Sequence, residues 1–204
     1  MKTSNIKIVS NHVYCKNTNI DTKLLEQVCW EKHDFLETVL DENNDHYVDN
    51  SFIAPITSRC YNQYNLLTLV TPPLHSVYSN IRDLFRKMID SDKPDYFIQC
   101  WLNIFTDQSP SLDWHRHFYD EKDAYHGFLV VVADVSYTEF RKPDDTRFTI
   151  HSYDGLLAIS PSYEDEHRTS PIRPGKTRIT IAFDIINTKL LDKYGYEMNH
   201  WIPI

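Results

Sequence analysis

The first half of the chain repeats hydrophobic positions with the period of an α-helix in two places. In Asp21–Leu40, apolar residues recur three and four positions apart, and Asp21 or Thr22 is suited to cap the first turn. A second stripe of this kind runs over His75–Ile89. Both are typical of helices that pack one face on a sheet. A short alternation in Ile6–Ser10 predicts an edge strand.

From Tyr96 onward the pattern changes to short segments with the period of a β-strand. Turn residues separate these segments, which are rich in β-branched and aromatic residues. The predicted strands are Tyr96–Phe105, Leu112–His117, Gly127–Ala133, Tyr137–Phe140, Arg147–Ile150, Leu156–Ile159 and Thr177–Ile185. Many short strands after two helices predict an α+β fold, in which N-terminal helices brace one sheet of a jelly roll.

The length of the chain, 204 residues, predicts a single domain over 1–204. Within it we expect a supporting region of helices and strands over 1–95 and a jelly-roll core over 96–185. The remaining tail, 186–204, either caps the barrel or forms a homodimer contact.

Glycine is scarce, and its spacing excludes two large classes of nucleotide-binding protein. The chain has four glycines, Gly127, Gly155, Gly175 and Gly195, and none are close enough together for a dinucleotide-binding or a Walker A loop. The formal net charge is −8, from 21 Lys and Arg against 29 Asp and Glu. This acidic balance disfavours nucleic acid as a partner.

Cysteine usage and the lack of long apolar runs predict where the protein works. No run reaches the roughly 18 apolar residues of a membrane span, and the first ten residues lack the apolar region of a signal peptide. The cysteines, Cys15, Cys29, Cys60 and Cys100, are widely spaced and form no C-x-x-C pair. We therefore expect reduced, mostly buried thiols and a cytoplasmic location.

Three of the ten histidines crowd into DWHRHFYDEKDAYH: His115, His117 and His126. On a strand, His115 and His117 would point to the same side and form half of a site for a divalent ion. A third ligand must come from elsewhere, and His167 lies 50 positions after His117, far enough to return to a neighbouring strand. The alternative is that His115 and His117 are a pair of surface histidines and that His167 lies in a loop, with no metal bound.

The last predicted strand, Thr177–Ile185, carries Arg178, Thr180, Ala182 and Asp184 on one side. An arginine and a threonine beside an alanine indicate a lined pocket, where the guanidinium group can bind a carboxylate bidentately. A face exposed to solvent would carry the same residues.

The first strand of the predicted core adds a second polar face. Gln99, Trp101 and Asn103 share one side of Tyr96–Phe105. Such a face is typical of a polar cavity wall, and equally of a hydrogen-bonded layer between two sheets.

These motifs, in this order, resemble the Fe(II)/2-oxoglutarate-dependent oxygenases, which have a double-stranded β-helix of the jelly-roll or cupin type. The resemblance is to the prolyl- and aspartyl-hydroxylase-like branch and to oxygenases of phage and marine bacterial genomes. It covers about Tyr96 to Ile185, and its most specific pieces are DWHRH, YHGF, EDEHRTSP and TRITIAFDI. It implies a dioxygenase, a hydroxylase, that uses Fe(II), the co-substrate 2-oxoglutarate and O₂, in the host cytoplasm if phage-encoded.

The resemblance also implies roles for individual residues. Arg178, helped by Thr180, would hold the distal carboxylate of 2-oxoglutarate, and His126 and Asn103 would contact the co-substrate. The candidate catalytic residues are His115, His117, His167 and Arg178. The resemblance makes His115 and His167 metal ligands, and His117 is the expected third.

The sequence departs from the family pattern at His117, where an H-x-D motif has its carboxylate. We expect His117 to be the third ligand of a three-histidine site. Otherwise Asp113 or Asp120 supplies a carboxylate, or the iron has two protein ligands and His117 faces the substrate.

Two other functions fit the same residues. A non-catalytic jelly-roll binding module would bind neither Fe(II) nor 2-oxoglutarate. A cupin-like enzyme with three histidines would bind metal and ignore 2-oxoglutarate, which leaves Arg178 and Thr180 without a purpose. For an oxygenase, the primary substrate is a protein side chain, an amino acid or a nucleobase.

Overall fold

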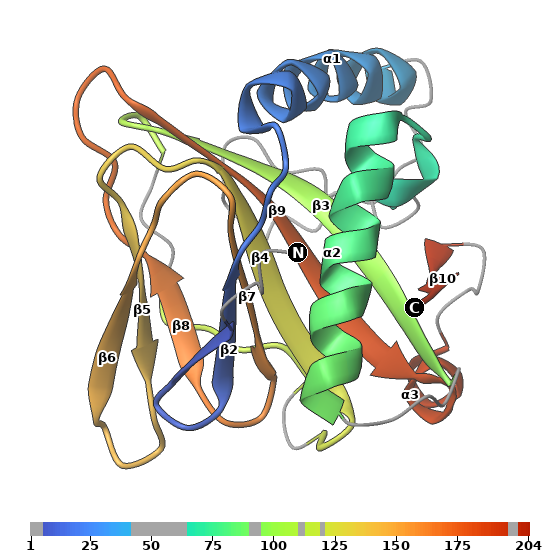
Figure 1. The fold of residues 1–204 in the computed structure, drawn as a ribbon, viewed down its shortest axis with the longest axis vertical. Helices are drawn as coiled ribbons and strands as arrows, with labels where there is room; N and C mark the ends of the chain where they lie inside the picture. The colour runs from blue at the N-terminus through green and yellow to red at the C-terminus, as the bar shows by residue number, and fades with distance from the viewer. Residues whose placement is uncertain (1–5, 42–64, 90–94, 110–112, 119–120, 196–199) are drawn as a thin grey trace.

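The chain folds into two antiparallel sheets that face each other, with helices on one outer side (Figure 1). The computed structural model describes residues 6–41, 65–89, 95–109, 113–118, 121–195 and 200–204. In the larger sheet the strands lie in the order β1 (Ile6–Val9), β2 (Val13–Asn17), β7 (Leu156–Pro161), β4 (Ala124–Val132), β9 (Thr177–Asn187), β3 (Tyr96–Thr106) and β10 (Ile202–Pro203). In the smaller sheet they lie in the order β6 (Arg147–His151), β5 (Tyr137–Arg141) and β8 (Glu166–Thr169).

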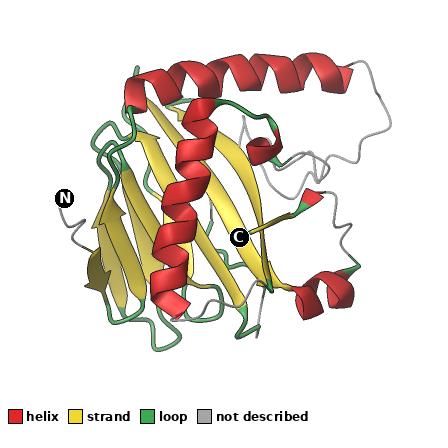
Figure 2. Ribbon diagram, turned by 45° about the vertical axis from the view of Figure 1, so that its right-hand side comes forward, coloured by secondary structure: helices red, strands yellow, loops and turns green. Residues whose placement is uncertain are grey.

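The two helices predicted in the first half are confirmed, as α1 (Thr22–Asp41) and α2 (Pro72–Ile89). Figure 2 shows α2 lying across the larger sheet, with α1 at one end of it. Their buried side chains form one core with the outward-facing residues of the sheet, among them Val77 and Ile81 of α2 and Ile181 of β9. The larger sheet therefore has a dry outer face under the helices, and its other face is turned toward the smaller sheet.

Both helices begin at side chains that accept hydrogen bonds. The carboxylate of Asp21 accepts from the backbone N–H of Leu24, so Asp21 is the cap of α1. Helix α2 starts three residues earlier than its apolar stripe, at Pro72, behind a hydroxyl of Thr71 that accepts from the N–H of Leu74. Proline fits the first turn because its missing N–H would have no helical partner there.

Six of the seven predicted strands of the core are confirmed, and so is the edge strand at the N-terminus. The expected strand Leu112–His117 is wrong within the described residues: 113–118 is irregular, and only His115 pairs, in a single bridge with His167. Inside this segment the ring of His115 donates to the carbonyl of Asp113. Such a local hydrogen bond competes with a strand ladder.

Strands β2, β8 and β10 carry too little alternation to be found in the sequence. The four residues of β8 are all polar and half-buried. Two further elements, η2 (Leu66–Thr68) and α3 (Thr188–Tyr194), flank the sheet, and the end of the tail pairs with β3 through β10.

Cys15, Cys29 and Cys100 are buried and free, as predicted, while Cys60 lies outside the described residues. Burial raises the pKa of the Cys15 thiol to about 11 and that of Cys29 to about 12. Among the helices that the structure describes, none is both long and apolar enough to cross a membrane.

Candidate functional site

The inner face of the larger sheet carries the polar residues that the sequence placed on two separate strands. In the register of β3 and β9, Asn103 lies opposite Thr180 and Gln99 opposite Asp184. Opposite residues of an antiparallel pair point to the same side, so both polar faces form one surface. Arg178, Thr180 and Asp184 are each at most 3% exposed, which excludes the solvent-facing alternative.

Three histidines come together where this surface meets the smaller sheet. One possible ligand atom each from His115, His117 and His167 lie within 4.8 Å of one another. His167 is the second residue of β8, and His115 is held beside it by two backbone hydrogen bonds of 2.8 and 3.2 Å. The expected strand would have placed His115 and His117 on the same side. The irregular segment has the same result, because it turns both histidines toward His167.

Hydrogen bonds at Nδ1 orient two of the three rings. His115 donates through Nδ1 to the carbonyl of Asp113 at 2.9 Å, and His117 through Nδ1 to Oδ1 of Asp184 at 2.6 Å. A ring that donates from Nδ1 leaves the lone pair of Nε2 for a metal ion. Asp113 contributes only its backbone oxygen here, and Asp120, the other carboxylate considered, lies outside the described residues.

His126 is the fourth histidine of this cluster. Its ring centroid lies 4.4 Å from that of His167 and 5.4 Å from that of His117. The side chain is 3% exposed, Nε2 is 3.0 Å from the hydroxyl of Ser160, and Nδ1 is buried without a hydrogen-bond partner in the described part of the chain. Burial is the main reason why the pKa of His126 is lowered to about 3. A neutral ring with one unsatisfied nitrogen is suited to contact a ligand.

Arg178 lies at the other end of the same inner face. Its guanidinium group donates to Thr169 at 2.8 Å and to Thr138 at 3.0 Å, and it lies 5.8 Å from the ring centroids of Phe105 and Phe128. The residue is 2% exposed, and Nε is buried without a partner. Within the described ranges no carboxylate forms an ion pair with it.

A buried cation without an anion is costly for a folded protein. Desolvation lowers the pKa of Arg178 to about 10, so the group stays charged at neutral pH. Buried charges in proteins are normally paired, and the fork of a guanidinium group fits a carboxylate. The surroundings of Arg178 are therefore suited to hold an anion, and we refer to them as the candidate anion site.

Arg178 and the histidines lie between the facing inner sides of the two sheets. Thr169, which accepts from Arg178, follows His167 by two positions on β8, so both side chains are on the inner face of the smaller sheet. Residues two positions apart on a strand are separated by about 7 Å, so Thr169 and His167 lie about that far apart along β8. The sequence did not predict a role for Thr138 and Thr169. Their role depends on the pairing of β5 with β8, in which they lie opposite each other.

The sequence matches no protein-family model and no curated protein. Among solved structures, a prolyl-4-hydroxylase from Pseudomonas putida is similar with a TM-score of 0.58 and 13% identity, over 87% of this chain and 94% of that chain. A prolyl 4-hydroxylase from Phytophthora capsici has a TM-score of 0.56 and 13% identity, over 88% of this chain and 60% of that chain. The carbocyclase SnoK of nogalamycin biosynthesis, described as non-heme and alpha ketoglutarate dependent, has a TM-score of 0.58 and 7% identity, over 86% and 79% of the two chains.

The chain has the prolyl-4-hydroxylase fold. The predicted double-stranded β-helix braced by N-terminal helices is thereby confirmed. The N-terminal hairpin, which we had assigned to the supporting region, belongs to the larger sheet itself, because β2 pairs with β7.

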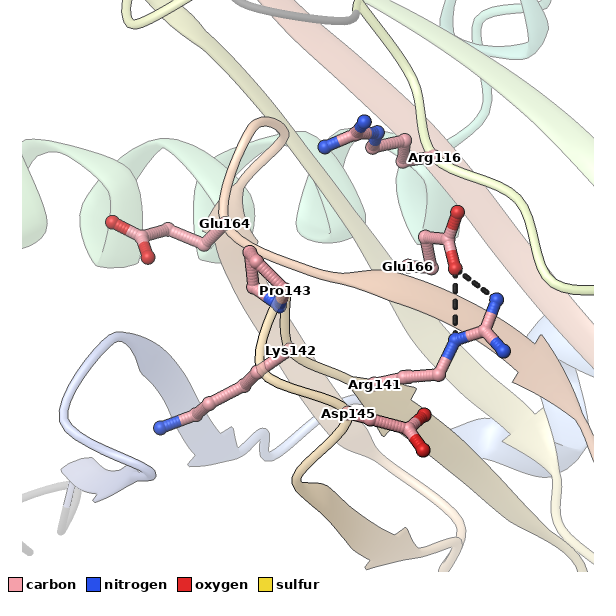
Figure 3. Close-up of a pocket in the computed structure, with 7 residues that line it drawn as sticks. All are labelled: Arg116, Arg141, Lys142, Pro143, Asp145, Glu164 and Glu166. Carbon is pink, nitrogen blue, oxygen red and sulfur yellow. Dashed lines mark hydrogen bonds and ion pairs between the residues drawn. The ribbon is translucent and has the colours of Figure 1, made fainter.

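Behind the histidines, on the outer side of the smaller sheet, lies a charged hollow of about 400 Å³ (Figure 3). Side chains on β8 alternate, so Glu166 and Arg168 point away from the face that carries His167. Glu166 is bound to Arg141, as the dashed lines in Figure 3 show. The lining residues are Arg116, Arg141, Lys142, Pro143, Asp145, Glu164 and Glu166.

On this outer side, Trp114 ties the segment of His115 and His117 to the smaller sheet. The guanidinium carbons of Arg168, Arg141 and Arg147 lie 4.5, 4.7 and 5.5 Å from the centroids of its rings. Each such contact contributes about 0.5–1 kcal/mol at exposed sites. The ring therefore adds to the backbone bridge with His167 and the hydrogen bond from His117 to Asp184 that hold this segment.

We expect Trp114→Ala to weaken the binding of a divalent metal about tenfold, because a loosened segment presents His115 and His117 for only part of the time. Titration with Co(II) measures the affinity, and amide hydrogen exchange of 113–118 measures the loosening. Trp114→Phe, which keeps an aromatic face, should retain most of the affinity. An unchanged affinity in Trp114→Ala would show that the arginine contacts do not position the histidines.

A second buried pair fixes the start of β8. Nδ1 of His12 donates to the carbonyl of Ser10 at 2.7 Å, and Nε2 forms an ion pair with Asp165, which is 1% exposed. The hydrogen bond to Asp165 is the main reason why the pKa of His12 is raised. Asp165 precedes His167 by two residues, so the pair links the first hairpin of the chain to the strand that carries this histidine.

We expect His12→Gln to lower the free energy of unfolding by about 1.5–3 kcal/mol at pH 6 and by less at pH 9. The folded protein holds the His12 proton more tightly than the unfolded chain. Its stabilisation is thus complete below the unfolded pKa of about 6.5 and is lost as pH rises through the raised pKa of the folded state. Urea unfolding at both pH values measures this difference. An equal loss at pH 6 and pH 9 would contradict the role of a charged imidazole.

Proposed function

We propose that this protein is an Fe(II)- and 2-oxoglutarate-dependent dioxygenase that hydroxylates its substrate. The observation that carries the proposal is the buried guanidinium group of Arg178, which has no carboxylate partner among the described residues and donates to Thr169, two positions from His167 of the three-histidine cluster. A metal site alone would not require a buried cation beside it. A dicarboxylate that binds the metal at one end and an arginine at the other fits both features.

The residues present fit these two groups. His115, His117 and His167 provide three neutral nitrogen ligands, which suit Fe(II). Nε of Arg178 and Nδ1 of His126 are buried polar atoms without a hydrogen-bond partner in the described residues, as expected around a polar co-substrate. When bound, Fe(II) and 2-oxoglutarate would supply the activation of O₂ that is needed to hydroxylate a C–H bond.

The protein's own residues would hold and orient the co-substrate and shield the metal site from water. Arg178, fixed by Thr138 and Thr169, would neutralise the distal carboxylate, and Thr180 lies next to Arg178 along the same face of β9. Asn103 lies opposite Thr180 and within reach of the same ligand. Trp101, 5% exposed and stacked at 5.9 Å on His117, keeps water from one side of the metal site.

Ligand-dependent thermal unfolding tests the proposal without a known substrate. Ni(II) or Mn(II), which do not turn over, should raise the melting temperature, and 2-oxoglutarate should raise it further only when metal is present. At 100 times its Kd, a ligand adds about 2.7 kcal/mol of stability. A response to metal alone would favour a three-histidine enzyme of another kind, and no response to metal would favour a binding module.

The cytoplasmic location, the single domain and the homodimer expected from the sequence stay predictions. The location follows from cysteine usage and the single domain from the length of the chain. The homodimer rests on the C-terminal tail alone. Trp201 and Ile204 of that tail are buried within the chain, which supports its role in capping the fold.

A further inference from the structure

At the position where an H-x-D motif has its carboxylate, this chain has His117, and the three imidazoles that the described residues bring together carry no charge to balance a divalent cation. A buried ion without a nearby opposite charge is costly to bind. A carboxylate is nevertheless close: Oδ1 of Asp184 lies 2.6 Å from Nδ1 of His117. Asp184 is 1% exposed, so water screens its charge little.

The backbone fixes Asp184 at this distance. It lies in the middle of the larger sheet, opposite His126 on β4 and opposite Gln99 on β3. Strands on both sides hold its backbone, and its carboxylate contacts His117 without belonging to the group of possible ligand atoms from His115, His117 and His167. The carboxylate therefore acts on a metal ion through the imidazole ring.

Asp184 is also separate from the candidate anion site. Arg178 lies six residues earlier on the same face of β9, roughly 20 Å away along the strand. The guanidinium group points to Thr138 and Thr169, whereas Asp184 is bound to His117. The inner side of β9 thus presents a carboxylate beside the proposed metal site and a guanidinium group near its other end.

We propose that Asp184, through its hydrogen bond to His117, supplies the negative charge that a ligating carboxylate would otherwise give the metal site. The inference rests on the proposed metal site. An acceptor at Nδ1 fixes the proton there, leaves Nε2 free for the metal and makes the ring a stronger electron donor. Asp184 is a positioning residue in this scheme: it touches a ligand and not the metal.

The isosteric variant Asp184→Asn tests the charge separately from the shape. We expect its anaerobic affinity for Fe(II) to fall 10- to 100-fold, the usual effect of losing such a partner. With 2-oxoglutarate added, the visible charge-transfer band should move to shorter wavelength, because the metal loses electron density. Asp154→Asn is the matched control, since Asp154 also accepts a hydrogen bond but does so from the backbone of Ala133.

The outcomes separate the inference from the proposed function. An Asp184→Asn protein with unchanged affinity, or with weaker affinity and an unmoved band, would overturn the charge role. A wild-type protein that binds no Fe(II) would instead overturn the proposed function. If Asp184→Asn does not fold, NMR of the Co(II)-loaded wild type decides. His117 should then show a slowly exchanging Nδ1–H, and its absence would contradict the hydrogen bond to Asp184.

Discussion

Replacement of Arg178 by methionine should abolish the binding of 2-oxoglutarate and at the same time stabilise the ligand-free protein. The guanidinium group is buried, charged and without an acidic partner in the described residues, so the folded state carries a cost that binding of an anion removes. Methionine fills a similar volume without charge. Replacing buried charges by apolar residues of similar size often gains about 1–4 kcal/mol.

For Arg178→Met we therefore expect a melting temperature raised by a few degrees and an affinity for 2-oxoglutarate reduced at least 100-fold. Differential scanning calorimetry with and without metal and 2-oxoglutarate measures both effects. Arg173→Met is the matched control, because the side chain of Arg173 is 54% exposed and pairs with Asp134 at the surface. A variant that is destabilised and still binds 2-oxoglutarate would show that Arg178 has a structural role only.

Replacement of His167 by alanine should remove metal binding. Loss of an outer partner of a ligand costs 10- to 100-fold in affinity, so loss of one of three ligands should cost at least about 100-fold. His167 lies at the centre of the cluster, with its ring 4.4 Å from those of His115 and His126. Equilibrium titration with Co(II) measures the loss.

His151→Ala provides the control for this variant. His151 is an exposed histidine at the end of β6, in the same small sheet, with its ring against Tyr137. The His151→Ala variant should bind metal with the affinity of the wild type. Strong metal binding by His167→Ala would mean that the proposed ligand set is wrong.

Several features of the fold could be predicted from local patterns. The alternation in Thr177–Ile185 identified which side chains of β9 face the helices and which face the cavity, because a strand with one dry and one polar face leaves a clear period of two. The stripe in His75–Ile89 identified α2 for the same reason, with a period of 3.6.

Other features depend on pairing between distant segments and leave no local signal. Strand β8 consists of polar residues because its inner face borders the site and its outer face carries ion pairs, so its sequence resembles a loop. The segment of His115 and His117 was expected to be a strand, whereas local hydrogen bonding and the stacking of Trp114 shape it.

In the candidate site, too, some residues could be predicted from the sequence and others depend on pairing between distant segments. His115, His117, His167 and Arg178 were expected from motif order, and the structure brings the three histidines together near Arg178, which donates to Thr169 on the strand of His167. The partners that hold them, Asp184, Thr138 and Thr169, come from other strands. Their roles follow from register, which only the folded chain reveals.

An anaerobic titration of the purified protein with Fe(II) and then with 2-oxoglutarate tests the proposed function most directly. The metal and the co-substrate together should give a weak visible charge-transfer band that neither gives alone. The band should be absent in His167→Ala and retained in His151→Ala. Fe(II) binding without any band after addition of 2-oxoglutarate, or no binding of Fe(II) at all, would contradict the proposal.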